Sequence, residues 1–259
     1  MDFGYVAAGA VSGLLIGLTG VGGGALMTPV LILVFGVAPT TAVATDLWFA
    51  AITKVAAVLR HRRQSTVNWP VVRRLWLGSL PAALITAVFV SMGTQFDQQA
   101  WMTQAIGLMV CLAALGLLFG PWLLRKATAA PLSAAQTAPS WQAPLTVCAG
   151  GGIGGAVALT SVGAGSLGVV LLMAIYRRQL SPQQIVLSDL VHAIPLAVVG
   201  GLAYAGMGLV DGRMLGLLLL GSLPAAWMGS HFAHALPPKR LQAALAGVLL
   251  LVGMKSLFF

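Results

Sequence analysis

Hydrophobic residues gather in long runs along the chain, with few polar positions inside them. Most runs approach the roughly 20 residues that an α-helix needs to cross a bilayer. The pattern therefore predicts an all-α polytopic membrane protein with about eight hydrophobic segments. These segments cover approximately residues 4–36, 40–59, 71–92, 100–124, 144–176, 183–206, 214–233 and 241–258.

The second half of the sequence repeats the first. The run Leu77–Ala83, LGSLPAA, recurs unchanged at Leu220–Ala226, and Asp46 has its counterpart in Asp189 at the same offset. Residues 125–143, rich in Ala, Pro, Ser, Thr and Gln, have the composition of an extended linker. We therefore predict a first transmembrane repeat over 1–124, a cytoplasmic linker over 125–143 and a second repeat over 144–259.

The opening segment of each half, about 33 residues long, is too long for one crossing and too short for two. Glycines interrupt each near its centre, which predicts a broken or re-entrant helix hairpin. With two such hairpins, the basic loops lie on one face, as the positive-inside rule requires. Three true crossings then remain in each half, so the two repeats are inverted relative to each other. The predicted cytoplasmic cations are Arg60, Arg62, Arg63, Arg73, Arg74, Arg125, Lys126, Arg177, Arg178, Lys239 and Arg240.

Composition supports lipid as the solvent. The 259 residues are 59% hydrophobic and 7% charged, whereas soluble domains carry about 25% charged residues. A net charge of +9 would suggest a nucleic-acid partner in a soluble protein, but here most cations occupy short loops between apolar runs. We therefore expect a multi-pass protein of the cell (inner) membrane, with no nucleic-acid partner. Cys111 and Cys148 lie in or beside apolar segments and are expected to act as small hydrophobes, with no metal or cofactor bound.

Two glycine-rich motifs are the first candidate site. They lie at matching places in the halves, Thr19–Gly24 and Thr160–Ser166, each within a hydrophobic segment. Irregular backbone in a membrane must line a cavity or be buried in protein. Amides exposed at the start of a following half-helix suit an anion, although glycines also serve close helix packing. The matched copies favour the anion site, with candidate residues Thr19, Gly22, Gly23, Gly24, Gly163, Gly165 and Ser166.

Two acidic pairs, Thr45-Asp46 and Ser188-Asp189, form the second candidate site. An ionisable group inside a membrane segment is a functional hypothesis by default. A protonated carboxyl could donate a hydrogen bond or carry a coupling proton, whereas an ionised one repels an anion. Alternatively, each Asp accepts hydrogen bonds from the free N–H groups of the broken helix. We predict proton or ion coupling for Asp46 and Asp189, and substrate contact for Thr45 and Ser188.

Two further polar residues lie in the same helices. His192 follows Asp189 by three residues, on the same helical face, and is a candidate to tune Asp189, to bind the anion or to serve packing. Lys54 lies about two turns after Asp46. It could attract the anion or extend to the membrane interface.

The run Gly17–Pro29, GLTGVGGGALMTP, followed by Pro39 and by AVATD at Ala42–Asp46, resembles the signature of the sulfite exporter TauE/SafE family of membrane permeases. The similarity extends over nearly the whole chain. It implies transport of sulfur-containing or related organic anions such as sulfite, sulfonates or thiosulfate. The second copy departs from this pattern at three places. Ala164 replaces a glycine, Gly168-Val169-Val170 takes the place of Met27-Thr28-Pro29, and Ser188 replaces Thr45.

The resulting expectation is a secondary transporter with a small anionic substrate, which is not an enzyme and has a second copy of the chain as a candidate partner. No ATP-binding motif of the form GxxxxGK[ST] occurs. Two alternatives remain. A cation permease would use Asp46 and Asp189 as ligands. An intramembrane serine protease would need Ser161 or Ser166 within hydrogen-bond reach of His192.

Overall fold

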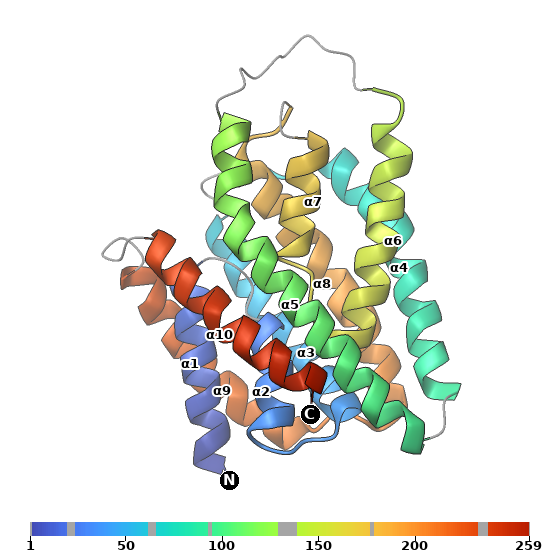
Figure 1. Ribbon diagram of the computed structural model, residues 1–259, viewed down its shortest axis with the longest axis vertical. Coiled ribbons are helices and arrows are strands. Elements are labelled where there is room, and N and C mark those ends of the chain that lie inside the picture. Colours follow the sequence, from blue (N-terminus) through green and yellow to red (C-terminus); the bar gives the residue numbers. More distant parts are fainter. Residues whose placement is uncertain are drawn as a thin grey trace.

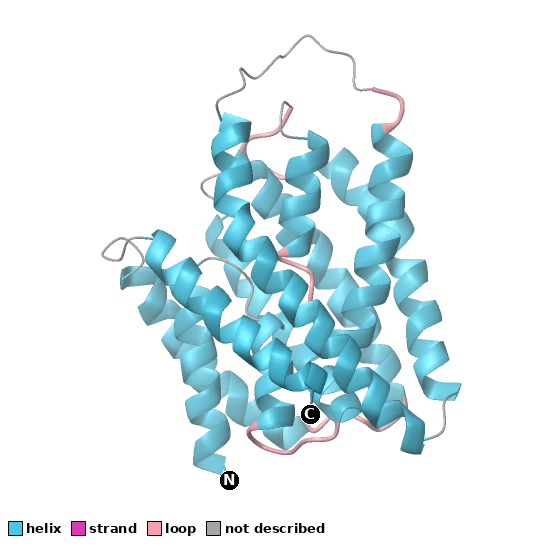
Figure 2. Cartoon of the chain, in the orientation of Figure 1, coloured by secondary structure: helices cyan, strands magenta, loops and turns pink. Residues whose placement is uncertain are grey.

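The computed structural model of the chain describes residues 2–19, 24–61, 66–92, 95–128, 139–176, 179–232 and 238–258. Within these ranges the regular structure is entirely helical (Figure 2), which confirms the predicted all-α class. The helices are α1 (Asp2–Thr19), α2 (Gly24–Leu33), α3 (Pro39–His61), α4 (Trp69–Met92), α5 (Gln95–Thr128), α6 (Gln142–Thr160), α7 (Leu167–Tyr176), α8 (Pro182–Gly206), α9 (Gly212–Phe232) and α10 (Pro238–Phe258).

The two longest apolar runs each fold into two helices. The first run forms α1 and α2, and the fifth forms α6 and α7. In Figure 1, α1 begins and α2 ends at the lower end of the molecule, whereas α6 begins and α7 ends at the upper end. The loop from α6 to α7 lies in the middle of the molecule (Figure 2). Helix α5 continues to Thr128, so the predicted linker begins as helix, and residues 129–138 lie outside the described part.

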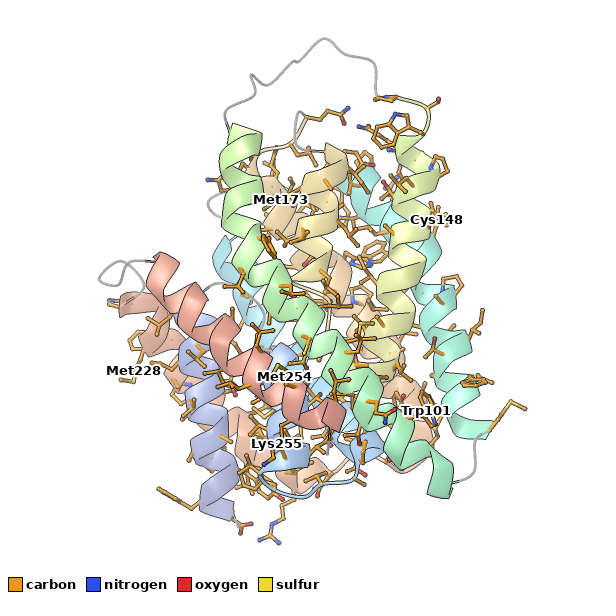
Figure 3. The ribbon with its side chains drawn as sticks, in the orientation of Figure 1. Trp101, Cys148, Met173, Met228, Met254 and Lys255 are labelled. Carbon is orange, nitrogen blue, oxygen red and sulfur yellow. The ribbon has the colours of Figure 1, made fainter. Side chains whose placement is uncertain are left out.

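Several helices have the length and composition of membrane spans. Among the described residues, four helical stretches qualify by length and apolarity: Pro39–Leu59, Trp69–Val90, Gln142–Thr160 and Pro182–Gly206. Shorter apolar helical stretches cover Asp2–Leu18, Trp101–Gly116, Leu167–Tyr176 and Ala246–Leu257. The labelled Trp101 and Lys255 both lie toward the lower end of the molecule, where α1 begins (Figure 3). The protein is therefore built as a multi-pass helical membrane protein.

Helices from different halves of the chain pack closely through glycine. Helix α1 packs against α9, and α6 packs against α4. A Cβ atom at Gly13 would collide with the carbonyl oxygen of Ser222, and one at Gly154 would collide with that of Ser79. The two contacts involve corresponding residues of the sequence repeat. Backbone-to-backbone approach of this kind is how membrane helices pack without a hydrophobic driving force.

Alanine at Gly154 is expected to destabilise the protein, because the added methyl group has to push α6 away from the α4 backbone. Overpacking of this kind costs about 1–3 kcal/mol. Gly152 lies in the same helix with open space around its Cβ position, so Gly152→Ala is a matched control. Thermal unfolding in detergent checks the prediction. Equal melting temperatures for the two variants would contradict the inferred close packing.

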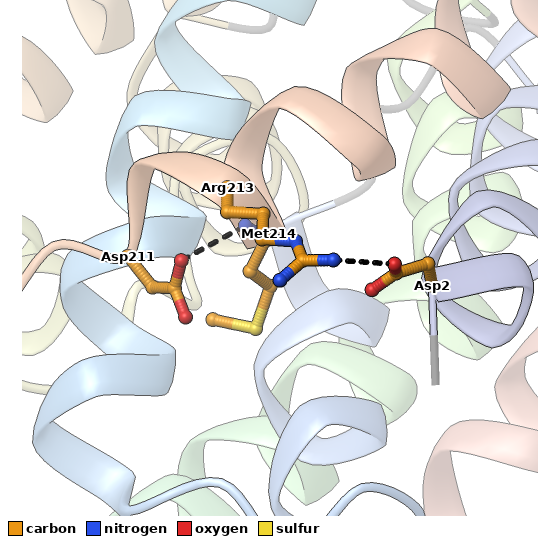
Figure 4. Close-up of polar contacts among 4 residues, drawn as sticks. All are labelled: Asp2, Asp211, Arg213 and Met214. Carbon is orange, nitrogen blue, oxygen red and sulfur yellow. Dashed lines mark hydrogen bonds and ion pairs between the residues drawn. The ribbon is translucent and has the colours of Figure 1, made fainter.

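Helices α4 and α9 start in the same way. The Asn68 side-chain oxygen accepts a hydrogen bond from the Val71 N–H at 3.2 Å, and the Asp211 carboxylate accepts one from the Met214 N–H at 2.9 Å. Side-chain acceptors of this kind satisfy N–H groups that the first helical turn leaves free. Beside the α9 start, an exposed ion pair of 2.6 Å joins Arg213 to Asp2 of α1 (Figure 4).

Candidate functional site

The break between α6 and α7 depends on unusual backbone conformations. Ser161, Gly163 and Gly165 have φ angles of 57°, 122° and 117°. L-residues with side chains rarely adopt the last two values. Gly163 and Gly165 are therefore required by the path of the chain, which bends out of the helix here.

The bend leaves backbone donors free inside the protein. Among the described residues, no acceptor bonds the N–H groups of Gly163, Ala164, Gly165 and Ser166, whereas the next two amides both donate to the Gly163 carbonyl at 3.1 and 3.2 Å. Ser161, Ala164 and Ser166 are buried. Buried N–H groups without partners are rare in folded proteins. Donors gathered at the start of α7, with the positive end of its dipole, can bind a negative group.

Asp46 of α3 lies between the two halves. Its side chain is fully buried, and one carboxylate oxygen accepts a hydrogen bond of 2.6 Å from the Thr28 hydroxyl of α2. The other oxygen has no partner among the described residues, nor has the buried Ser161 hydroxyl. The Ser161 side chain faces the Asp46 carboxylate without meeting hydrogen-bond geometry. An acid of the first half thus reaches the helix break of the second.

Asp189 of α8 occupies the corresponding place in the second half. It is fully buried, and neither carboxylate oxygen has a hydrogen-bond partner in the described part of the chain. A Cβ atom at Gly168 would collide with this carboxylate, so the first turn of α7 lies directly against it. The Gly165 amide also faces Asp189 without meeting hydrogen-bond geometry.

Lys54 is 2% exposed, so its side chain does not extend to an interface. It interacts electrostatically with both Asp46 and Asp189. No ion pair within 4.0 Å joins it to either acid in the described structure. One buried cation therefore accompanies two buried carboxyl groups whose hydrogen-bonding capacity is largely unused.

Thr45 and Ser188 are fully buried, and the hydroxyl of each bonds the backbone at the start of another helix. The Thr45 hydroxyl accepts a hydrogen bond from the Asp211 N–H at 3.2 Å, and the Ser188 hydroxyl accepts one from the Asn68 N–H at 3.0 Å. These donors are the capping residues of α9 and α4. Both hydroxyls thus lie beside the acids and bond the starts of other helices, and their predicted contact with substrate stays a prediction.

His192 joins α8 to α4. Its Nε2 lies 2.9 Å from the Ser79 hydroxyl, and its carbonyl accepts a hydrogen bond from the Trp76 indole N–H at 3.1 Å. Its Nδ1 has no partner within the described residues. The ring is electrostatically coupled to Lys54. The structure thus connects His192 with Ser79, and none of the hydrogen bonds in the described part of the chain joins it to Ser161 or Ser166.

The first glycine motif is described only at its borders. Thr19 is the last residue of α1, and Gly24 is the first residue of α2. The structure describes the backbone of Thr19 but not its side chain. Gly22 and Gly23 lie outside the described residues. Their predicted contact with substrate stays a prediction.

Sequence reasoning missed two members of the cluster as site residues. Thr28 lies inside the quoted motif, directly before Pro29, yet only the return of α2 alongside α3 shows that it bonds Asp46. Ser161 was considered only as a nucleophile, whereas in the structure it faces Asp46. A hydroxyl inside an apolar segment was the available signal, but its partner depends on the tertiary fold.

An all-helical apolar chain with several span-length helices and a buried polar cluster at a helix break defines a multi-pass membrane protein of the transporter class. A model of the family described as sulfite exporter TauE/SafE matches residues 5–256. The chain belongs to this family of membrane transporters.

Curated relatives carry names of the same kind. "Probable membrane transporter protein YjnA" of Bacillus subtilis (strain 168) is 36% identical over 264 residues, covering 98% of this chain and 99% of the relative. "Probable membrane transporter protein YdhB" of the same organism is 26% identical over 245 residues, covering 92% and 96%. No solved structure matches the chain at a significant level.

Proposed function

We propose that the protein is a secondary transporter of the cell membrane for small sulfur-containing or organic anions such as sulfite, sulfonates or thiosulfate. The observation that carries the proposal is the group of free amides, Gly163 to Ser166, at the buried break before α7. Four donors in a water-poor interior can replace the hydration of a sulfonate or sulfite oxygen. Capping within the protein leaves these donors unsatisfied, because the Asp189 carboxylate, which faces the Gly165 amide, does not meet hydrogen-bond geometry.

We further propose that the two halves are inverted repeats around this point. The matched glycine contacts of α1 with α9 and of α6 with α4 support a two-fold relation. So do the α1–α2 and α6–α7 pairs, whose outer ends lie at opposite ends of the molecule (Figure 1). The amides of Gly22 to Gly24 would then contribute the second half of the anion site.

Asp46 and Asp189 are proposed to couple transport to protons. Ionised carboxylates beside the amides compete with and repel an anionic substrate, whereas a protonated carboxyl removes the repulsion and offers a hydrogen-bond donor. Their unpartnered oxygens leave room for a proton to be gained without breaking an existing hydrogen bond.

A cation permease is the second candidate, favoured by those same oxygens, which are suitable ligands for a hard cation. The buried Lys54 ammonium, coupled to both acids, speaks against it. The serine protease alternative lacks support, because His192 bonds Ser79 and the described structure gives neither Ser161 nor Ser166 a catalytic base.

Ligand binding by the purified protein tests the proposal. A ligand that binds only the folded state stabilises it, by about 2.7 kcal/mol at one hundred times its Kd. We expect a rise in melting temperature with sulfite, thiosulfate, methanesulfonate or sulfoacetate, and none with matched sodium, calcium or magnesium chloride. Stabilisation by the cations, with none by the anions, would replace the proposal with the cation permease.

A further inference from the structure

Lys54 is a buried cation to which the proposed function assigns no role in transport. It lies on α3, is 2% exposed, and is coupled to Asp46 on its own helix and to Asp189 on α8. Helices α3 and α8 pack directly against each other. The cation and the two acids therefore form one electrostatic unit beside the α6–α7 break.

The charge of this unit is strongly constrained. Net charge in a low-dielectric interior is costly, so a buried cluster is most stable when its charges cancel. With Lys54 protonated, neutrality requires one ionised and one protonated carboxyl. The two acids then share a single negative charge in the empty transporter.

We propose that Lys54 is the counter-ion of the transported anion, and that a monovalent anion is bound together with one proton. The proposal rests on the proposed function. In the empty state the ammonium is balanced by one carboxylate. When the anion arrives, that carboxylate takes up a proton on one of its oxygens, and the ammonium is balanced by the anion instead. Both states are neutral, and no covalent bond forms or breaks apart from the new O–H bond.

Other charged and titratable groups of the described residues lie on the helices around this unit. From α8, His192 is also coupled to Lys54, and it is counted as neutral because its ring bonds the Ser79 hydroxyl and no carboxylate. The described side chains of α2, α5, α6 and α7 carry no charge; the polar ones are hydroxyl, thiol and amide groups and the Tyr176 phenol, which bonds Thr146. Helix α4, which packs against α8, carries Arg73 and Arg74, and Arg74 donates to the Tyr176 hydroxyl. Asp211 and Arg213 of α9 are both exposed: the Asp211 backbone bonds the hydroxyl of Thr45, next to Asp46, and Arg213 pairs with Asp2 (Figure 4).

Charge balance in this unit also ranks substrates by their charge. A monovalent sulfonate plus one proton leaves the unit neutral. A divalent anion such as sulfate leaves one uncompensated negative charge, because only one carboxylate remains to be protonated. The transporter should therefore prefer monovalent anions to divalent anions of similar size.

Calorimetric titration of the purified protein with methanesulfonate tests the proposal. This anion keeps its charge at all working pH values, so protons taken up belong to the protein. Titrations in buffers of different ionisation enthalpy give the number of protons bound. We expect about one proton per anion for the natural protein. Lys54→Gln should bind about a hundredfold more weakly, as expected for removing one partner of a buried charge pair. Lys54→Arg should retain most of the affinity.

Further variants separate this inference from the proposed function. Asp46→Asn combined with Asp189→Asn should still bind methanesulfonate but take up no proton. Lys255→Gln, at an exposed position in α10, is the matched control and should match the natural protein (Figure 3). Unchanged affinity in a folded Lys54→Gln protein, or unchanged proton uptake in the double variant, would overturn the role of Lys54 while leaving the anion site intact. Absence of methanesulfonate binding to the natural protein would instead count against the proposed sulfonate substrate.

Discussion

Proteoliposomes containing the Asp46→Asn, Asp189→Asn double variant should no longer accumulate a sulfonate in response to a pH gradient. If one proton moves with each monovalent anion, a gradient of one pH unit supports about tenfold accumulation by the natural protein. The double variant has no carboxyl group at either position to carry that proton. Accumulation should therefore fall to none, while anion exchange across the membrane continues.

Asp2→Asn is a suitable control, because Asp2 is a 56% exposed acid in a surface ion pair. It should accumulate the sulfonate as the natural protein does. Accumulation by the double variant at the natural level would remove Asp46 and Asp189 from the coupling mechanism. Loss of exchange together with loss of accumulation would instead assign the acids to packing.

Alanine at Gly165 should weaken anion binding by about tenfold or more, the effect of losing one hydrogen bond to a charged group. With φ at 117°, Gly165 has a conformation that alanine disfavours, so the substitution shifts the amides that surround the break. Isothermal titration with methanesulfonate gives the ratio of dissociation constants.

Backbone strain alone must be separated from loss of the site. Gly208, in the turn after α8, also has positive φ, at 70°, with open space around its Cβ position. Gly208→Ala therefore places alanine at another positive φ, outside the Gly163–Ser166 break, and it should bind methanesulfonate with natural affinity. Equal affinities for Gly165→Ala and Gly208→Ala would contradict an anion site at the Gly163–Ser166 amides.

The helical class and the two helix breaks were predictable because each depends on local sequence. A hydrophobic run of about 33 residues with glycines at its centre fits neither one span nor two, and the structure has two helices there. Asp46 and Asp189 could also be recognised from the sequence as candidate functional residues, since acids are costly inside apolar segments. Both are fully buried in the structure.

Side-chain partners could not be predicted, because they join residues far apart in the sequence. The Thr45 hydroxyl, whose predicted substrate contact stays a prediction, accepts a hydrogen bond from the backbone of Asp211, 166 residues away. His192 was considered with Asp189, whereas its ring bonds Ser79 on another helix. The burial of Lys54 likewise depends on how α3 packs against α8, and no periodicity along α3 reveals it.

Uptake of radiolabelled sulfite and methanesulfonate into proteoliposomes is the most direct test of anion transport by this protein. We expect time-dependent uptake above that of empty liposomes, accelerated by unlabelled anion on the opposite side and by a pH gradient. Uptake equal to that of empty liposomes, with the same preparation carrying a sodium or calcium flux, would contradict it.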